Sequence, residues 1–492
     1  MHYLLGVDVG TTGTKTILFR QDGTIMGQAY RSYPIHTPQV GFCEQDPLDW
    51  WNAVCETVRQ VSADPEVRSR IVAIAMSTQG GTTVGIDENG DAVRPAMVWN
   101  DKRCTQELAQ FKEDMPQLDV YRICGWNAST AMPALQCRWL KNNEPENFAR
   151  IRQFLSVPDY LAWKMTGKAV VDISNAGICR LADIQTARYH EELLAYAGLS
   201  RQQLADILPS AAPVGKLTAQ AAQALDLPQE VLLVSGAHDQ YAGALGAGVC
   251  KDGDIIIGSG TSWVVTSISK EPDFESGLAL SVPAVPGMWG SLRSLSSGGV
   301  CLEWWRKNLT VDEDGSLLTY DRINEEAANR KAAEEGLFFF PFSGQSSQKT
   351  NFKKASFVGL DLSHDRFHIA RAIMEGVAFQ IVWMMEAFRA KPSKDGIILS
   401  GGASKSELWS QMVADIAGLP VRIPATADLT CVGAAVMAGV GCGLYANAEE
   451  GYQKLAVPDR VIQPRPAESA RMQALFVQYK AIAKALGAAY DL

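Results

Sequence analysis

The stretch LLGVDVGTT at residues 4–12 decides the fold, because an apolar run ends there in a tight turn that carries hydroxyl groups. The run is typical of a strand and the turn of a hairpin, and the β pattern resumes at residues 15–19 and 25–33. A helix is expected to begin after Asp46, a suitable N-cap that is followed by proline. The apolar run at residues 71–76 then predicts a strand covered on both faces. Three strands, a helix and a further strand predict a mixed sheet and an α/β fold.

A similar stretch, IIGSGTS at residues 256–262, follows about half a chain later, so that Gly10 and Gly260 occupy matching places in their turns. A chain of 492 residues exceeds what one hydrophobic core usually holds. Two interpretations stay open: a chance likeness of two Gly-Thr hairpins, or two domains of like fold that present hydroxyl-lined hairpins to a shared cleft. In the second case we expect the boundary near residues 245–252, where the Gly/Ala-rich helix 241–248 could act as a hinge.

Composition narrows the classes of function. Hydrophobic residues make up 47% of the chain and charged residues 20%, which is typical of globular proteins. The net charge of −9 comes without any basic run, so we expect no nucleic acid partner. Ten cysteines without C-x-x-C spacing indicate buried thiols in a reducing cytoplasm.

Neither a secretion signal nor a membrane span is expected. The N-terminus lacks a basic n-region, and no apolar run approaches the ~20 residues of a membrane helix. The run at residues 431–444 comes nearest, but its glycines and alanines favour close helix packing. Residues from about 105 to 225 have a helix-rich pattern and are expected to form one wall of the cleft. A cytoplasmic protein without a membrane partner is therefore predicted.

The first candidate for chemistry is the turn at residues 10–13. No G-x-x-x-x-G-K-[ST] string occurs, which excludes a P-loop. Consecutive backbone N–H groups and hydroxyls in a tight turn can nevertheless hold phosphate oxygens. Asp8 could hold Mg²⁺ through water, since Mg²⁺ favours one or two carboxylates together with substrate phosphates. A plain hairpin with an aspartate at its edge explains the same residues.

The second candidate is LLVSGAHDQ at residues 232–240, where a buried strand is expected to enter a small-residue turn and meet Asp239 at the head of a helix. An N-cap aspartate, worth about 1 kcal/mol, is one interpretation. A carboxylate that faces the cleft as a general base for a substrate hydroxyl is the other. His238 is expected only to be packed or solvated.

The third candidate is IILSGGASKSE at residues 397–407, a strand that leads through two glycines into a helix. The pair Ser404 and Glu407 predicts a capping box at the start of that helix. Paired glycines let backbone approach a flat ligand, and a helix N-terminus favours an anion. Ordinary turn geometry accounts for the same pattern.

These three segments, in this order, resemble the FGGY family of carbohydrate kinases, within the actin-like ATPase superfamily, over essentially the whole chain. ASFVGL at residues 355–360, followed after seven residues by HIARAIME at 368–375, is similar to the C-terminal signature of that family at every position. The other family signature, at residues 131–140, is only partly present. Gln136 stands where lysine is usual, and Ala131 departs from the preferred residues.

The resemblance implies an α/β fold of two ribonuclease H-like domains around a central cleft. Residues 1–246 would form the sugar-binding domain with the catalytic base, and residues 247–492 the nucleotide-binding domain. The implied activity is ATP-dependent phosphorylation of a hydroxyl of a small sugar (a ketose) or an alditol, and the implied assembly is a homodimer. A non-catalytic sensor of sugar and nucleotide on the same fold is the alternative, although it would be expected to lose the base or the phosphate turns. A nicotinamide dehydrogenase is not supported, because the first strand is not followed by G-x-G-x-x-G.

The resemblance also implies a role for individual residues. Asp239 matches the general base, and Asp8 matches the acidic residue near Mg²⁺, held through water. The residues implied to contact ATP are Thr11, Thr12, Gly13, Gly260, Thr261, Gly299, Glu303, Gly402, Ala403 and Ser406. The residues expected on the substrate wall are Gln79, Gly80, Asp101 and Gln240.

The identity of the substrate stays open. Glycerol kinases would have Arg-Glu, and xylulose kinases resemble Met-His, where Gly80 and Gly81 stand here. We expect the two glycines to leave room and to remove a charged clamp. WNDKR at residues 99–103 resembles the W-N-D-x-R of pentulose kinases, so Asp101 could bind sugar hydroxyls, or the segment could be a surface loop over a tryptophan.

Overall fold

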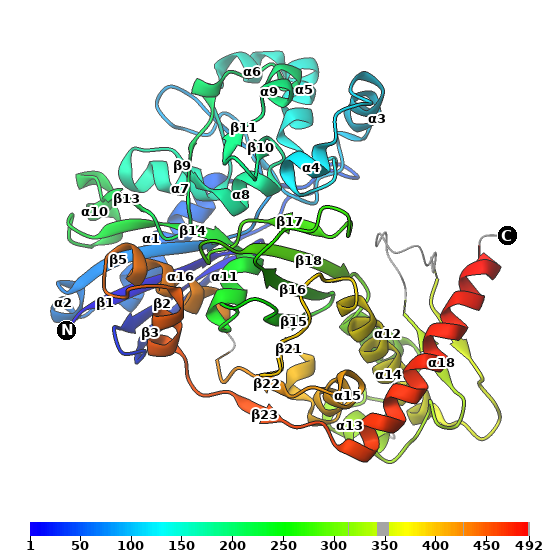
Figure 1. Ribbon diagram of the computed structural model, residues 1–492. Helices are drawn as coiled ribbons and strands as arrows, with labels where there is room; N and C mark the ends of the chain where they lie inside the picture. The colour runs from blue at the N-terminus through cyan, green and yellow to red at the C-terminus, as the bar shows by residue number, and fades with distance from the viewer. Residues whose placement is uncertain (313, 342–353, 427, 491–492) are drawn as a thin grey trace.

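Two large mixed sheets organise the computed structural model, which describes residues 1–312, 314–341, 354–426 and 428–490. The first sheet has the order β13 (Pro213–Lys216), β14 (Leu232–His238), β5 (Ile71–Thr78), β1 (Tyr3–Val9), β2 (Gly13–Arg20) and β3 (Ile25–Ser32). The second has the order β17 (Ala279–Ser281), β18 (Trp289–Leu295), β16 (Trp263–Ser269), β15 (Ile255–Ser259), β21 (Ile397–Gly401), β22 (Val421–Ile423) and β23 (Arg460–Ile462). Figure 1 shows the first sheet at the left, with the N-terminus, and the second running down the centre.

The two sheets share one topology. In the first, β1, β2 and β3 are antiparallel neighbours, while β5 and β14 run parallel to β1 on its other side. In the second, β15, β16 and β18 are antiparallel neighbours, while β21 and β22 run parallel to β15 on its other side. The two Gly-Thr hairpins therefore join corresponding strands, β1 to β2 in the first sheet and β15 to β16 in the second. The prediction of an α/β fold built from two like domains is confirmed.

Helices cover both sheets. Those before β15 are α1 (Pro47–Val61), α2 (Pro65–Arg68), α3 (Thr105–Asp114), α4 (Val120–Cys124), α5 (Pro133–Asn143), α6 (Pro145–Arg150), α7 (Val157–Thr166), α8 (Ile173–Ile178), α9 (Glu191–Ala197), α10 (Ala219–Leu225) and α11 (Asp239–Gly246). Those after it are α12 (Gly299–Asn308), α13 (Tyr320–Ala328), α14 (Arg366–Met385), α15 (Glu407–Ala417), α16 (Leu429–Gly441), α17 (Ala448–Leu455) and α18 (Pro466–Tyr490). None of the helices in the described ranges is long and apolar enough to cross a membrane.

Short paired strands complete the fold. They are β4 (Glu44–Gln45) with β7 (Ala96–Met97), β6 (Val84–Ile86) with β8 (Gln153–Leu155), β9 (Val170–Asp172) with β12 (Asp206–Leu208), β10 (Ala182–Asp183) with β11 (Arg188–Tyr189), and β19 (Phe338–Phe340) with β20 (Ser356–Val358). The region between residues 105 and 225 is helix-rich, as expected. It also contains strands that the sequence analysis did not anticipate, because two or three residues are too few to show an alternating pattern.

Several elements lie where local sequence signals predicted them. The side chain of Asp46 accepts a hydrogen bond from the backbone N–H of Leu48 at 2.9 Å and so caps α1. The apolar stripe of α1 is buried at Trp50, Val54 and Val58. Since the N-cap and the 3.6-residue period both depend only on neighbouring residues, the sequence was sufficient to predict them.

Helices α11 and α16 pack closely although they come from different halves of the chain. A Cβ at Gly433 would lie 1.9 Å from the carbonyl oxygen of Ala242, and one at Gly246 would lie 1.9 Å from that of Leu429. Only glycine fits at either position without moving backbone. The expectation that the Gly/Ala-rich run at 431–444 favours close packing is confirmed. Helix α16 also lies against the first sheet (Figure 1), so α11 and α16 join the two halves.

Two local expectations were wrong. Strand β14 continues through His238, so no small-residue turn precedes Asp239. Helix α15 begins at Glu407 with Ser406 as its N-cap, whose hydroxyl accepts from the N–H of Trp409 at 3.1 Å. The hydroxyl of Ser404 instead donates to the carbonyl of Gly401 at 2.8 Å, so it does not form the predicted capping box.

The link between α11 and β15 spans residues 247–254. It lies within the expected boundary region, where the first sheet has ended and the second has not begun. We propose that the domains meet there, as 1–246 and 247–492.

Eight of the ten cysteine side chains are buried.

Candidate active site

The hairpin between β1 and β2 is held from outside by side chains of other elements. The side-chain amide of Gln45 donates to the carbonyl of Thr11 at 2.6 Å, and the Tyr33 hydroxyl donates to the carbonyl of Gly10 at 2.6 Å. The indole N–H of Trp99 donates to the Thr11 hydroxyl at 3.1 Å. These contacts fix the turn and leave Thr12 exposed at its tip. A preorganised turn of this kind suits an anion, because its N–H groups need no rearrangement to bind.

Three carboxylates gather beside this hairpin. The pKa of Asp8 is raised to about 6, mainly by burial. The negative charge of Asp239, and to a smaller extent that of Asp428, acts in the same direction. The Ser77 hydroxyl donates to Asp8 at 2.9 Å, and Lys15 lies 2.6 Å from Asp428. The site therefore concentrates negative charge that a divalent cation would offset, which fits a Mg²⁺ ion bound together with phosphate.

Few protein ligands are available for such an ion. In the described part of the chain, no group of three or more His, Cys, Asp or Glu side chains is arranged to hold a metal. Mg²⁺ takes one or two carboxylates and leaves its other positions to water and substrate phosphates. Asp8 stays our candidate for that carboxylate.

Asp8→Asn should stabilise the ligand-free protein at pH 8. The folded-state pKa of Asp8 is raised, so its contribution to stability is full at low pH and is lost as the pH rises through about 6. Removing the charge should raise the free energy of unfolding by about 1–3 kcal/mol at pH 8. Thermal melts of both proteins at pH 8 and pH 5 would measure this. A gain that is absent at pH 8, or that does not shrink at pH 5, would contradict the burial of an ionised Asp8.

Asp239 is the first residue of α11, directly after β14. The N-cap of α11 is His238, so Asp239 does not act as the capping residue. The carboxylate of Asp239 is about one-third exposed, and its Oδ1 accepts from the side-chain amide of Gln240 at 3.2 Å. Both side chains line a groove of about 220 Å³, which Gly258 and Gly401 of the second sheet also line. The groove therefore joins the two halves at Asp239.

A larger cavity of about 570 Å³ lies in the C-terminal half. All seven residues of this half that were expected to contact ATP line it, namely Gly260, Thr261, Gly299, Glu303, Gly402, Ala403 and Ser406. The cavity is also lined by Trp263, Tyr320, Asn324, Lys405 and Trp409, which the sequence analysis did not identify. Its size is in the range of small-molecule sites.

The paired glycines lie next to both the groove and the cavity. Gly401 lines the groove at Asp239, and Gly402 lines the cavity. Gly401 has φ of +91°, and a Cβ there would lie 2.6 Å from the carbonyl oxygen of Ser259. The backbone N–H of Gly402 donates to the same carbonyl at 2.7 Å. Glycine at position 401 is therefore required by the positive φ and by the close approach of the Ser259 backbone.

Glu303 lies at the edge of the cavity, and its carboxylate accepts hydrogen bonds from neighbouring side chains. Arg306 donates to it at 2.8 Å and Tyr320 at 2.5 Å. The hydrogen bond from Arg306, followed by that from Tyr320, lowers the pKa of Glu303 to about 2. The carboxylate stays ionised near neutral pH and holds Tyr320 against the cavity.

The substrate wall differs from what was expected at Gly80. A Cβ at Gly80 would lie 2.7 Å from Cδ2 of His238 and 2.8 Å from Cγ2 of Ile178. The space beside this glycine is therefore filled, and the expectation that it lies empty for substrate was wrong. Gln79 donates to the side chain of Gln45 at 2.9 Å, and its own Oε1 is buried without a partner among the described residues.

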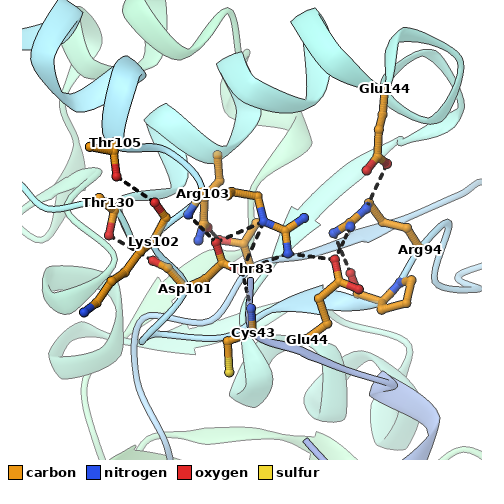
Figure 2. A network of polar contacts seen from close by, with 12 residues as sticks. Cys43, Glu44, Thr83, Arg94, Asp101, Lys102, Arg103, Thr105, Thr130 and Glu144 are labelled. Atoms are coloured by element: carbon orange, nitrogen blue, oxygen red, sulfur yellow. Dashed lines mark hydrogen bonds and ion pairs between the residues drawn. The ribbon is translucent and has the colours of Figure 1, made fainter. Parts of the chain in front are cut away.

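Asp101 is buried in an ion-pair network, which Figure 2 shows. Its two oxygens accept from the backbone N–H of Cys43 at 2.6 Å, from the backbone N–H of Arg103 at 2.9 Å, and from the Arg103 guanidinium at 2.8–3.1 Å. Arg103 also donates to Glu44 at 2.7 Å, and Glu44 accepts from Arg94 at 2.5 Å. These donors occupy the acceptor positions of the carboxylate. We correct the expectation on this point: Asp101 anchors a loop, and we do not carry it forward as a substrate contact.

Residues that the sequence analysis missed reach the site through tertiary structure. Gln45 lies on the short strand β4, and Tyr320 begins α13. Trp99 was read only as part of a loop motif. Neither Gln45 nor Tyr320 stands in a glycine-rich turn or another local signature, so no pattern along the chain marks them.

Comparison with known proteins supplies the family. The N-terminal domain model of the FGGY family of carbohydrate kinases matches residues 3–246, and the C-terminal domain model matches residues 256–442. The chain is 27% identical to a gluconokinase of Bacillus subtilis (strain 168), covering 91% of this chain and 88% of that protein. It is 28% identical to a xylulose kinase of Lactococcus lactis subsp. lactis (strain IL1403), covering 98% and 97%.

Solved structures agree over the whole chain. The structure of xylulose kinase from Rhodospirillum rubrum superposes with a TM-score of 0.91 at 26% identity and covers 100% of both chains. Ligand-bound xylulose kinase from Lactobacillus acidophilus superposes with a TM-score of 0.90 at 25% identity, covering 100% of this chain and 99% of that one. These matches confirm the two-domain actin-like ATPase fold. The chain is an enzyme that belongs to the FGGY family of carbohydrate kinases.

Proposed function

We propose that this kinase transfers the γ-phosphoryl group of ATP to a hydroxyl of a small sugar or alditol, with Asp239 as the general base. One observation carries the proposal. The groove that contains Asp239 is lined by Gly401, and the cavity expected to hold ATP is lined by the next residue, Gly402. A hydroxyl beside Asp239 would thus face the end of the nucleotide that carries the phosphates.

The chemistry follows from this placement. The Asp239 carboxylate accepts the proton of the attacking hydroxyl. Gln240 holds one oxygen of that carboxylate, and the hairpin residues Thr11, Thr12 and Thr261 offer N–H and hydroxyl donors to the phosphates. A Mg²⁺ ion, when bound near Asp8, would supply positive charge to the phosphate oxygens. Phosphoryl transfer needs little covalent help from the protein, so positioning and electrostatics carry most of the rate.

Hydrogen bonds between the two halves of the chain support exclusion of water. The Tyr121 hydroxyl of α4 donates to the carbonyl of Leu278 at 2.7 Å, and the N–H of Leu280 donates to the carbonyl of Gly125 at 2.8 Å. These bonds join the helix-rich wall of the first half to β17 of the second. Enclosure of this kind limits hydrolysis of ATP by water.

A substrate panel tests the proposal. The panel should contain D-xylulose and other ketoses, alditols, and gluconate, since the relatives are named xylulose kinase and gluconokinase. We expect ADP production that depends on at least one of these compounds. Binding of ATP and of a panel compound without ADP production would favour the sensor and contradict the kinase assignment.

Homodimer formation stays a separate prediction, which light scattering would check.

We expect glycerol to be a poor substrate, with kcat/KM at least about a hundredfold below that of the best five- or six-carbon substrate. Glycerol kinases would have Arg-Glu where Gly80 and Gly81 stand, and here an imidazole fills the space beside Gly80. Each lost hydrogen bond to a charged group costs about 1.5–3 kcal/mol. Two such losses correspond to roughly a hundredfold or more.

The same panel measures this discrimination, with ATP held at saturation. Glycerol as the best substrate would contradict this account of the pocket. It would leave the kinase assignment intact, because that assignment depends on Asp239 and the nucleotide cavity.

A further inference from the structure

The imidazole of His238 touches the carboxylate that we assign as the base. Its Nε2 lies 3.1 Å from Oδ1 of Asp239. The His238 side chain is buried, with 8% of it exposed, whereas about a third of the Asp239 side chain is exposed. The contact therefore reaches Asp239 from the protein side of the groove.

The orientation of the His238 ring is fixed from several directions. The backbone N–H of His238 donates to the Ser174 hydroxyl at 2.9 Å, and Ser174 in turn donates to the buried Asp172. The ring of Trp126 lies edge-on at 6.4 Å between centroids, and that of Tyr241 is tilted at 6.0 Å. A side chain held in this way keeps one geometry towards its partner.

The partners of the two ring nitrogens assign the tautomer. Nε2 faces a carboxylate oxygen, which is an acceptor. Nδ1 is buried and has no hydrogen-bond partner among the residues that the structure describes. Because Nδ1 has no acceptor to donate to, the proton of the neutral ring belongs on Nε2, where it can be donated to Asp239.

Gly80 keeps the space that the ring needs. A Cβ at this position would lie 2.7 Å from Cδ2 of His238, the ring atom next to Nε2. The same Cβ would lie 2.8 Å from Cγ2 of Ile178, so it could not shift away from the ring without displacing Ile178. A side chain at position 80 would push the imidazole away from its present place beside Asp239.

We propose that His238 is a positioning residue for Asp239, and that Gly80 is its steric partner. This inference rests on the proposed role of Asp239 as base. His238 Nε2 lies 3.1 Å from Oδ1 of Asp239, and the Gln240 amide donates to the same oxygen at 3.2 Å. Oδ2 is thereby left for the substrate hydroxyl, whose proton moves to it while the hydroxyl oxygen bonds to phosphorus and ADP leaves. His238 gains and loses no proton in this step.

Two variants of similar size separate hydrogen bonding from packing. His238→Leu removes the donor, and His238→Gln keeps an N–H at a comparable distance along the side chain. We expect His238→Leu to lower kcat about tenfold to a hundredfold, the scale of a carboxylate misplaced by about 1 Å. KM for ATP should stay within about twofold, since the nucleotide cavity is lined by other residues. His238→Gln should recover most of kcat.

Gly80→Ala offers a second route to the same displacement without changing the imidazole. It should lower kcat in the same direction. In the double variant Gly80→Ala/His238→Leu, the loss should be no greater than in the worse single variant, because both changes remove one contact. If His238→Leu does not fold by thermal melting, the pair His238→Gln and Gly80→Ala decides the question.

Several results would overturn the inference. They are a folded His238→Leu that keeps kcat within twofold, a His238→Gln as impaired as His238→Leu, or losses that multiply in the double variant. Asp239→Asn, assayed in parallel, separates the two levels of the account. If Asp239→Asn keeps its turnover, the assignment of the base fails. If it loses turnover while His238→Leu does not, only the role of His238 fails.

Discussion

Asp239→Asn should lower kcat by roughly 10²–10⁴-fold, the usual contribution of a general base. The amide occupies the same volume at the head of α11, and Asp239 does not cap that helix. Stability and the binding of ATP and sugar should therefore be retained. Steady-state ADP production with the best panel substrate measures kcat, and calorimetric titration of ATP measures binding.

Asp206→Asn is a suitable control for that experiment. Asp206 is a mostly exposed aspartate whose side chain pairs with Arg201, and it lines neither the groove nor the nucleotide cavity. This variant should keep wild-type turnover. An Asp239→Asn protein that retains more than half of kcat would contradict the assignment of the base.

Arg103→Met should lower the free energy of unfolding by about 3–5 kcal/mol, as expected when one partner of a buried ion pair is removed. Only 1% of the Arg103 side chain is exposed, and it bridges Asp101 and Glu44 (Figure 2). Its guanidinium also lies 4.0 Å from the centre of the Phe42 ring. Methionine would replace part of the packing but leave the buried Asp101 without its cation, whereas Glu44 keeps Arg94. Chemical denaturation measures the loss.

Arg122→Met is the matched control, because Arg122 is also paired with acidic residues but is 55% exposed. Exposed pairs contribute about 0–1 kcal/mol, so this change should be nearly neutral. Equal losses for the two variants would contradict the importance of burial in the network.

A loss of activity in Arg103→Met, measured below its melting temperature, is also expected, since Glu44 precedes the Gln45 that holds Thr11.

Local signals carried most of the fold prediction. Apolar alternation and the Gly-Thr turns predicted both hairpins, and Asp46 with Pro47 predicted the start of α1. The likeness of the two hairpins left a chance match and a repeated domain both open, because a β-hairpin is determined by neighbouring residues. The family resemblance is what implied two like domains. The seven residues around the nucleotide cavity were identified from family motifs and are gathered in one place.

Long-range packing explains what the sequence did not predict. The space beside Gly80 belongs to His238, which arrives from another strand of the sheet. Asp101 was expected either to bind sugar hydroxyls or to lie in a surface loop, because its motif does not show the N–H of Cys43, which comes from elsewhere in the chain. The capping box at Ser404 failed because the carbonyl of Gly401 competes for its hydroxyl. Each error concerns a partner that sequence proximity does not indicate.

The most direct measurement is the ratio of sugar monophosphate to ADP formed by the wild-type enzyme. Mass spectrometry of the products from ATP and the best panel compound would give both quantities in one reaction. The account predicts one sugar monophosphate for each ADP, and neither product above background in Asp239→Asn. ADP without a phosphorylated sugar would contradict phosphoryl transfer to a sugar hydroxyl in the groove at Asp239.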